Sequence, residues 1–343
     1  MNAAVRRLGT PNSSIVGFAR PVFDRLAGVI VGSLHQSGRL MRHSSWLKVE
    51  SSAVLYPLYE FYRKVPPRWR VPVRWALLPH WSLMTAVVRT SARQRVLAGP
   101  FAGTRLFVSE QTGRLLPCYY LGTAELEIQD AVESLIARRY ATVLNIGAAD
   151  GYYAVGLARR LPKARVIAFE AVDAFRPVLE RTAAANGVAH RIEIKGHCDR
   201  GALRAALAGA ELPILVVSDV EGYETELLDP AAIPELKGAD LLIETHDASV
   251  RGCTEIMTDR FRATHAVERF VGQPRELDDL PARSLPLFRK LFPKMTVELM
   301  NERRAGIQQW LCCRIRPDGP AKISASQWGG SDRAGERSYC SRA

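Results

Sequence analysis

Long apolar runs are missing from the sequence, and their absence excludes whole classes of protein. The longest, LAGVIVGSL at Leu26–Leu34, is much too short to span a bilayer. No apolar core followed by a cleavage-like small-residue site lies near the start, so we expect no secretory signal. The 343 residues are 47% hydrophobic and 24% charged, which is typical of globular proteins. We therefore predict a globular, cytoplasmic protein.

Cysteine pairs with metal-binding or redox spacing are also missing. None of the six cysteines forms a C-x-x-C pair, and the two adjacent ones lie on an expected strand, where neighbouring side chains point to opposite faces. We predict reduced, mostly buried thiols in a reducing compartment and no structural zinc site. The six are Cys118, Cys198, Cys253, Cys312, Cys313 and Cys340.

Acidic residues are scarce at the N-terminus. Residues 1–95 hold 15 Lys and Arg but only three acids, and the rest of the chain carries equal numbers of both signs. The net charge of +12 therefore belongs to this region, which also contains four of the six tryptophans. The pattern favours helices that pack their aromatic residues on a main domain. The alternative is a basic, aromatic face for a membrane surface, which would make the protein peripheral at the membrane. No motif predicts nucleic-acid binding.

Three parts of the chain differ in pattern. Residues 1–96 predict a helical, basic N-terminal extension, and residues 97–316 predict the main domain. Within that domain, residues 97–122 predict a β-hairpin with a turn near Gln111–Gly113, and residues 273–305 form a Pro- and Leu-rich insertion on the substrate side. The tail, residues 317–343, is expected to be disordered.

The main domain alternates regularly between two patterns. The apolar segments TVLNIG, ARVIAFE, RIEIKG, PILVVSDV and ADLLIETH are each followed by a helical pattern, the last of them at residues 254–265. GIQQWLCCRI adds a final strand. Such alternation predicts an α/β fold with a doubly wound, mostly parallel sheet of Rossmann-like type.

The first strand runs into a loop of small residues in VLNIGAADGYYAVGLA. Gly147, Ala149 and Gly151 allow a ligand to approach the backbone closely, and Glu170 ends the next strand, where an acid can bind ribose hydroxyls. The spacing is G-x-x-x-G, not the G-x-G-x-x-G of dinucleotide sites, and Asp150 would repel a phosphate. A phosphate-free, cationic nucleoside such as S-adenosylmethionine suits this loop.

Several motifs together carry a family resemblance. VLNIGAADGYYAVGLA and VIAFEA resemble the first two motifs of Rossmann-type S-adenosylmethionine-dependent methyltransferases. LVVSDVEGYETELLD and ADLLIETHD resemble motifs of the FkbM-like branch, and the resemblance covers about residues 97–315. It implies a seven-stranded sheet and methyl transfer, typically to a hydroxyl oxygen of a sugar or secondary metabolite.

The resemblance also assigns residues to the cofactor. It implies that the small-residue loop and Glu170 bind S-adenosylmethionine, and that Asp199 stands where such enzymes place an adenine contact. Asn145 departs from the pattern, which has an acid there to bind the methionine amino group. Its side-chain carbonyl can accept a hydrogen bond, and Asp150 could supply the missing charge.

The fourth and fifth strands should be neighbours, so the acids and the histidine at their ends should cluster at one edge of the cofactor cleft. These residues are Asp219, Glu221, Glu244, His246 and Asp247. Asp219 or His246 would act as a general base that takes the hydroxyl proton. Alternatively Asp219, Glu221 and Glu244 would bind magnesium, although the sequence favours no metal. In a third interpretation Glu221 and Glu244 cap helices or pair with arginines, which is favoured for Glu221. Asp219 is favoured as a functional residue because its strand end faces the expected cofactor.

The sequence therefore predicts a methyltransferase that acts on a hydroxyl-bearing small molecule, including sugar, lipid-linked and secondary-metabolite acceptors. Two alternatives stay open. One is an NAD(P)-dependent oxidoreductase, which the glycine spacing disfavours. The other is a non-catalytic Rossmann-like protein that acts through its basic, aromatic region as an interaction or membrane-docking module.

Overall fold

The computed structural model describes residues 66, 69, 79–108, 116–282, 284–302 and 308–316. The predictions for most of the N-terminal extension and for the tail at residues 317–343 lie outside these ranges, as does Cys340. Within them, no helix combines the length and the apolar character needed to cross a bilayer.

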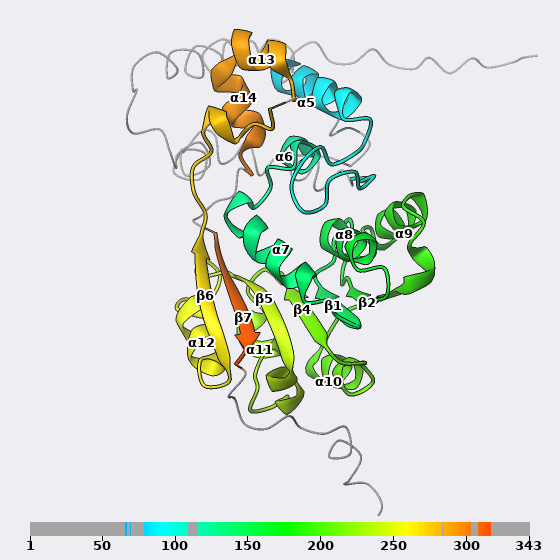
Figure 1. Ribbon diagram of the computed structural model, residues 1–343, viewed down its shortest axis with the longest axis vertical. Helices are drawn as coiled ribbons and strands as arrows, with labels where there is room; N and C mark the ends of the chain where they lie inside the picture. The colour runs from blue at the N-terminus through cyan, green and yellow to red at the C-terminus, as the bar shows by residue number, and fades with distance from the viewer. Residues whose placement is uncertain are drawn as a thin grey trace, which may run out of the picture.

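The described strands form one seven-stranded sheet in the order β3-β2-β1-β4-β5-β7-β6 (Figure 1). Only β7 runs against its neighbours β5 and β6, so the predicted doubly wound, mostly parallel sheet is confirmed. Every residue of β1, β4 and β5 is buried, which is why these segments read as continuous apolar runs. The strands are β1 Thr142–Ile146, β2 Arg165–Phe169, β3 Ile192–Lys195, β4 Ile214–Ser218, β5 Ala239–Thr245, β6 His265–Val271 and β7 Gln309–Ile315.

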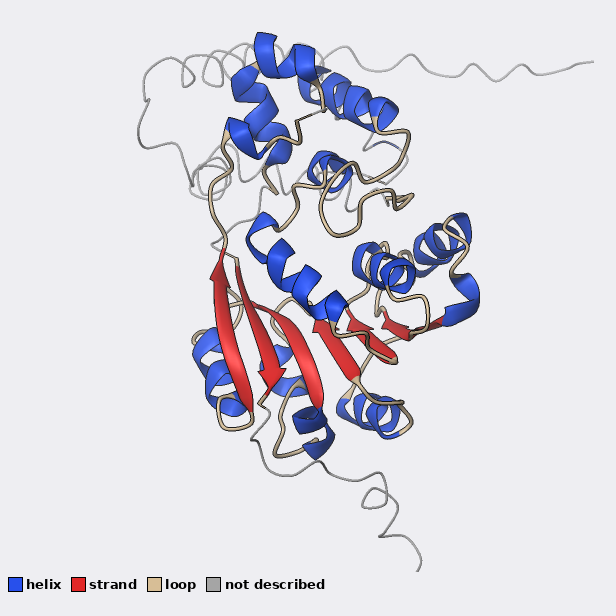
Figure 2. Ribbon diagram, viewed as in Figure 1, coloured by secondary structure: helices blue, strands red, loops and turns tan. Residues whose placement is uncertain are grey.

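Helices cover both faces of the sheet (Figure 2). One face packs against α7 Gln129–Ala137, α8 Tyr152–Arg160 and α9 Arg176–Ala185. The other packs against α10 Arg200–Ala208, α11 Glu224–Leu227 and α12 Cys253–Phe261. Short 3-10 helices lie at Leu126–Ile128, Ala189–Arg191, Pro234–Gly238 and Leu277–Asp279. Because the helices bury both faces, ligands can reach the strands only at their ends.

Four further helices gather beyond the end of the sheet toward which β6 points (Figure 1). They are α5 Pro79–Ser91, α6 Leu116–Leu121, α13 Pro286–Leu291 and α14 Pro293–Met300. Arg275, in the insertion, is buried between Glu127 and Glu302, with N–O distances of 2.9 Å to each. These ion pairs join the insertion at residues 273–305 to the segment before β1. They lie at the carboxyl ends of the parallel strands, where sheets of this type bind ligands.

The predicted β-hairpin at residues 97–122 does not form among the residues described there. Arg95 and Arg105 make a single isolated bridge, and residues 116–121 are helical. Phe101 instead packs edge-on against Tyr152 and Tyr153, at ring-centroid distances of 5.1 and 5.5 Å. Asn186, directly after α9, accepts from the N–H of Arg105 and donates to its carbonyl. The segment is therefore held by α8 and α9, not by an antiparallel partner strand, and this tertiary packing overrides the local strand pattern.

Strand β6 was not predicted from the sequence, which indicated a helix at residues 254–265 and no strand directly after it. Helix α12 ends at Phe261, and HAVERFV then pairs with β7 at the edge of the sheet. Unlike the fully buried central strands, β6 buries one residue completely, and its other residues remain at least partly exposed. An edge strand that carries charges gives little of the apolar signal from which strands are predicted.

Candidate cofactor and acid–base site

Gly147 joins β1 to the loop that the sequence assigns to the cofactor. It has φ +78°, and a Cβ added there would lie 1.7 Å from the backbone oxygen of Asp219. Its N–H and that of Ala148 both donate to the carbonyl of Phe169, at 3.0 and 2.9 Å. Glycine is therefore required, because the loop passes directly over the ends of both β4 and β2.

Glu170 at the end of β2 holds the same loop from the side. Its Oε2 accepts a hydrogen bond from the N–H of Ala149 at 2.7 Å, and its Oε1 accepts one from Val172 at 2.7 Å. The side chain is 5% exposed. Ala149 and Gly151 have φ of +44° and +93°, so the chain turns tightly around this carboxylate. Each oxygen keeps a further lone pair, and the pair suits two adjacent ribose hydroxyls.

Asn145 and Asp150 are both buried at the start of the loop. The Nδ2 of Asn145 lies 3.5 Å from the carbonyl of Val217, and its Oδ1 has no hydrogen-bond partner among the described residues. A buried acceptor without a donor costs about 1–3 kcal/mol, which a ligand N–H would recover. Asn145 therefore offers an acceptor that fits the amino group of a methionine moiety.

Asp199 follows β3 and caps α10. Its Oδ1 accepts a hydrogen bond from the N–H of Ala202 at 2.7 Å, and the side chain is exposed. The cap explains why an acid stands at this position without any ligand. The adenine contact that the resemblance implies for Asp199 stays a prediction.

The ends of β4 and β5 bring together the acids and the histidine that the sequence singled out. The Nε2 of His246 lies 3.6 Å from Oδ1 of Asp219, 3.5 Å from Oε2 of Glu221 and 3.9 Å from Oε1 of Glu244. The His246 side chain is 13% exposed, and that of Glu221 is 84% exposed. Four members of the expected cluster therefore come together, with His246 at the centre. The carboxylate of the fifth, Asp247, instead accepts from Thr254 and from Nε2 of Gln309 at 3.1 Å.

The surroundings of His246 favour its charged form. Burial lowers the pKa of the imidazole. Its hydrogen bond with Glu224 and the charges of Glu244, Glu224 and Glu221 together raise that pKa by more than burial lowers it, so the net shift is upward. Glu224 contributes most to the upward shift: its Oε1 lies 2.7 Å from Nδ1 of His246, and it is fully buried. The last acid of DVEGYE was not assigned a role from the sequence, although its place in that motif was a signal.

The two acids proposed earlier as magnesium ligands beside Asp219 have different roles here. Asp219, Glu221 and His246 are the group of described residues whose ligand atoms come within 4.8 Å of one another. Glu244 accepts a hydrogen bond from Nε2 of Gln308 at 2.6 Å, a partner that is neither a helix N-terminus nor an arginine. An imidazole nitrogen beside carboxylates is not the all-oxygen donor set that magnesium prefers. The magnesium set of Asp219, Glu221 and Glu244 is thus not supported.

A second acidic group lies between α8 and the insertion. Tyr153 donates a hydrogen bond to Glu125, whose backbone N–H donates to Oε1 of Glu302 at 2.7 Å. Burial raises the pKa of Tyr153 well above its usual value. Its ring centroid lies 5.9 Å from that of Trp310, whose buried indole nitrogen has no hydrogen-bond partner among the described residues. These side chains connect the start of α8 to β7 and the insertion.

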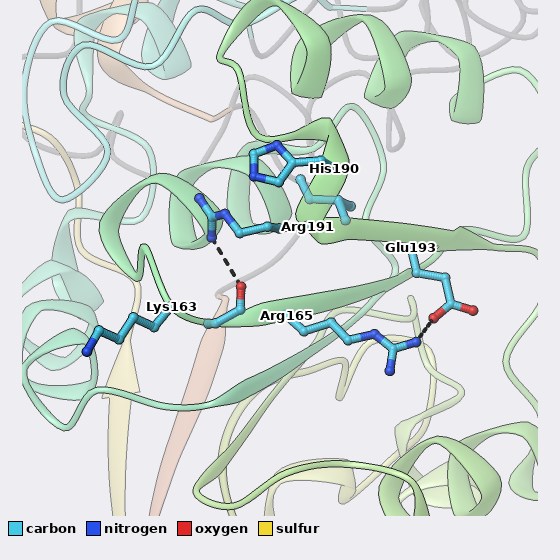
Figure 3. A pocket seen from close by; sticks show the side chains of 7 residues that line it. Lys163, Arg165, His190, Arg191 and Glu193 are labelled. Atoms are coloured by element: carbon cyan, nitrogen blue, oxygen red, sulfur yellow. Dashed lines mark hydrogen bonds and ion pairs between the residues drawn. The ribbon is translucent and has the colours of Figure 1, made fainter.

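A cavity of about 610 Å³ lies at the opposite edge of the sheet, where β2 and β3 begin (Figure 3). Two of its four basic side chains are engaged. Arg191 donates to the carbonyls of Leu161 and Ala164 at the end of α8, and Arg165 pairs with Glu193. Arg191 thus joins the segment before β3 to the segment after α8, whereas the pair of Arg165 is solvent-exposed. The acids and the histidine that the sequence singled out lie at the other ends of the strands, so that site is the candidate functional site.

No family model and no curated protein matches the sequence. Solved structures similar to this chain include the O-methyltransferase TomG of Streptomyces achromogenes, in complex with SAM, at 17% identity and a TM-score of 0.37, covering 67% of this chain and 88% of that one. The O-methyltransferase of Bacillus cereus, in complex with SAH, has 14% identity and a TM-score of 0.37, covering 68% and 90%. The N-terminal domain of human METTL16 has 13% identity and a TM-score of 0.40, covering 67% and 81%.

Proposed function

We propose that the chain is an S-adenosylmethionine-dependent methyltransferase that methylates a hydroxyl of a sugar, lipid-linked or secondary-metabolite acceptor. The observation that carries the proposal is the loop that bends around Glu170, with Gly147 pressed against the end of β4. This arrangement offers backbone groups and the buried carboxylates of Glu170 and Asp150. The nearby Arg176 already donates to the Glu170 carbonyl and pairs with Asp173, so little here favours a phosphate. It suits a cationic nucleoside that has a ribose and no phosphate.

The residues fit such a cofactor at three points. Glu170 would bind the ribose hydroxyls, Asn145 would accept from the methionine amino group, and Gly147, Ala149 and Gly151 would leave room for the backbone contacts. When bound, S-adenosylmethionine supplies an already activated methyl group. The protein must therefore align the acceptor oxygen and exclude water.

The remaining task is removal of the hydroxyl proton. His246 and Asp219 both stand at the strand ends beside the loop, and Nε2 of His246 is the atom that would accept the proton, with Asp219 as the alternative base. The acids around His246 would stabilise the imidazolium that forms. Comparing turnover of His246→Ala and Asp219→Asn decides between them, because only loss of the base removes the general-base contribution.

Calorimetric titration with S-adenosylmethionine tests the proposed cofactor. We expect Glu170→Gln to weaken binding by about tenfold or more, because hydrogen bonds to a charged group are each worth about 1.5–3 kcal/mol. Glu180→Gln, at an exposed acid of α9, is the matched control and should bind as the unchanged chain does. Absence of heat with S-adenosylmethionine would refute the proposal, and heat with NADH in its place would favour the oxidoreductase.

Labelled S-adenosylmethionine then separates an enzyme from a binding module. Transfer of label to any member of a panel of sugar, lipid-linked and small-metabolite hydroxyls supports catalysis. Binding without transfer across that panel favours the non-catalytic alternative. A chelator should leave transfer unchanged, since no metal step is part of the proposal.

We also propose that residues 1–95 contact an anionic membrane surface, on the basis of their charge and tryptophan content. Flotation of the whole chain with anionic vesicles tests this, compared with a variant that carries Arg63→Glu, Arg68→Glu and Arg70→Glu. Equal flotation of the two proteins would refute the proposed membrane contact.

A further inference from the structure

We propose that Glu224 is a positioning residue: its buried carboxylate holds the imidazole of His246 so that Nε2 faces Asp219 and Glu221 as the base of the transfer reaction. The inference rests on the proposed methyltransferase function. It adds a residue to which neither the sequence motifs nor the similar structures gave a role.

The first step is the direction of the hydrogen bond. A carboxylate only accepts, so the 2.7 Å contact between Oε1 of Glu224 and Nδ1 of His246 requires the proton on Nδ1. The lone pair of the neutral imidazole is then on Nε2. That atom lies 3.6 Å from Asp219 and 3.5 Å from Glu221, at the carboxyl end of β4. The contact with Glu224 thus selects the tautomer that can accept a proton on the side of the strand ends.

The second step is the rigidity of Glu224 itself. Its Oε1 also accepts from the backbone N–H groups of Val220 and Gly222, each at 3.3 Å, and the Sγ of Cys253 donates to Oε2 at 3.9 Å. The carboxylate therefore ties the loop after β4 to helix α12. Because the residue is fully buried between these elements, it can fix the ring orientation more firmly than an exposed acid could.

The third step is electrostatic. The titratable groups that face the imidazole are Asp219 and Glu221 after β4, Glu224 on α11 and Glu244 on β5, together with the thiol of Cys253 on α12. Of these groups, Glu224, Glu244 and Glu221 favour a protonated ring. A base surrounded in this way gains driving force for proton transfer, provided that the working pH keeps it neutral beforehand.

The pair is tested without any acceptor by NMR titration of the His246 ring in the whole chain, with His246→Asn used to assign its signal. In Glu224→Gln the carbonyl can still accept from Nδ1–H, but the charge is gone. We expect the pKa of His246 to fall by about one unit or more. Glu226→Gln, at an exposed acid on the same helix, should leave it unchanged. An unaltered pKa in Glu224→Gln would overturn the proposal.

Turnover gives the second readout. Glu224→Gln should move the acidic limb of the kcat profile to lower pH, as the NMR pKa moves. Glu224→Ala, which frees the ring, should lower kcat by about 100-fold with unchanged S-adenosylmethionine affinity. Full kcat in Glu224→Ala would also overturn the proposal, and if that variant does not fold, the isosteric Gln variant decides. Failure of the unchanged chain to bind S-adenosylmethionine sinks the proposed function instead, while the NMR shift still decides whether Glu224 controls His246.

Discussion

Gly147→Ala should both destabilise the protein and abolish cofactor binding. The added Cβ would lie 1.7 Å from the carbonyl oxygen of Asp219, whereas real Cβ atoms stay at least 3.0 Å from such neighbours. The end of β1 and the end of β4 would therefore have to separate by more than one ångström. Both segments are backbone within a packed sheet, so no side chain can rotate away to relieve the contact.

The magnitude follows from two terms. A left-handed backbone costs an alanine about 1–2 kcal/mol relative to glycine. Overpacking against a fixed neighbour costs about 1–3 kcal/mol more. Gly187→Ala provides the control, because Gly187 has φ +71° and nothing within 4 Å of an added Cβ. It should show the first term alone. The gain from a less flexible unfolded chain is common to both variants and cancels in the comparison.

Urea unfolding measures the two free-energy changes, and calorimetry measures S-adenosylmethionine affinity in each variant. We expect Gly147→Ala to lose about 1–3 kcal/mol more than Gly187→Ala and to bind no cofactor detectably. Equal stability of the two variants, with equal affinity, would show that the loop is not constrained by the end of β4. The inference that close backbone approach builds the cofactor loop would then be wrong.

Three further predictions concern stability and thiol chemistry. Arg275→Leu should cost about 3–5 kcal/mol in urea unfolding because it leaves two buried carboxylates without their partner. Arg289→Leu, which breaks a surface pair, should cost under about 1 kcal/mol, and a similar loss in both would refute the distinction. Burial raises the pKa of Tyr120 to about 12, whereas the phenol of the unfolded chain ionises near 10. The contribution of the neutral Tyr120 to the free energy of unfolding is therefore fully present below about pH 10 and is lost as the pH rises toward 12. Urea unfolding at stepped pH should show the unchanged chain losing stability relative to Tyr120→Phe over that interval, and a constant difference would contradict it. The five described cysteines are buried and form no disulfide, and those with shifted pKa values have them raised by burial, so a thiol reagent should modify none of these five in the folded chain. Rapid modification of any of the five would contradict their burial.

The sequence by itself determined the order of most strands and helices, because buried parallel strands are continuous apolar runs with helical patterns between them. The sequence also located the loop of Gly147 and the acid Glu170, because both directly follow apolar strands whose ends are visible in the local pattern. The predicted burial of the cysteines is confirmed for the five in the described residues on the same grounds.

Tertiary structure decided what depended on residues far apart in the chain. Residues 97–108 pack on α8 and α9 in place of a hairpin, and β6 exists because β7 offers it a paired edge. The pairing of Glu224 with His246, 22 residues away, arises only when β4 and β5 lie side by side. Local sequence encodes the backbone preference of each segment. The protonation and orientation of a side chain are set by whatever the fold packs against it.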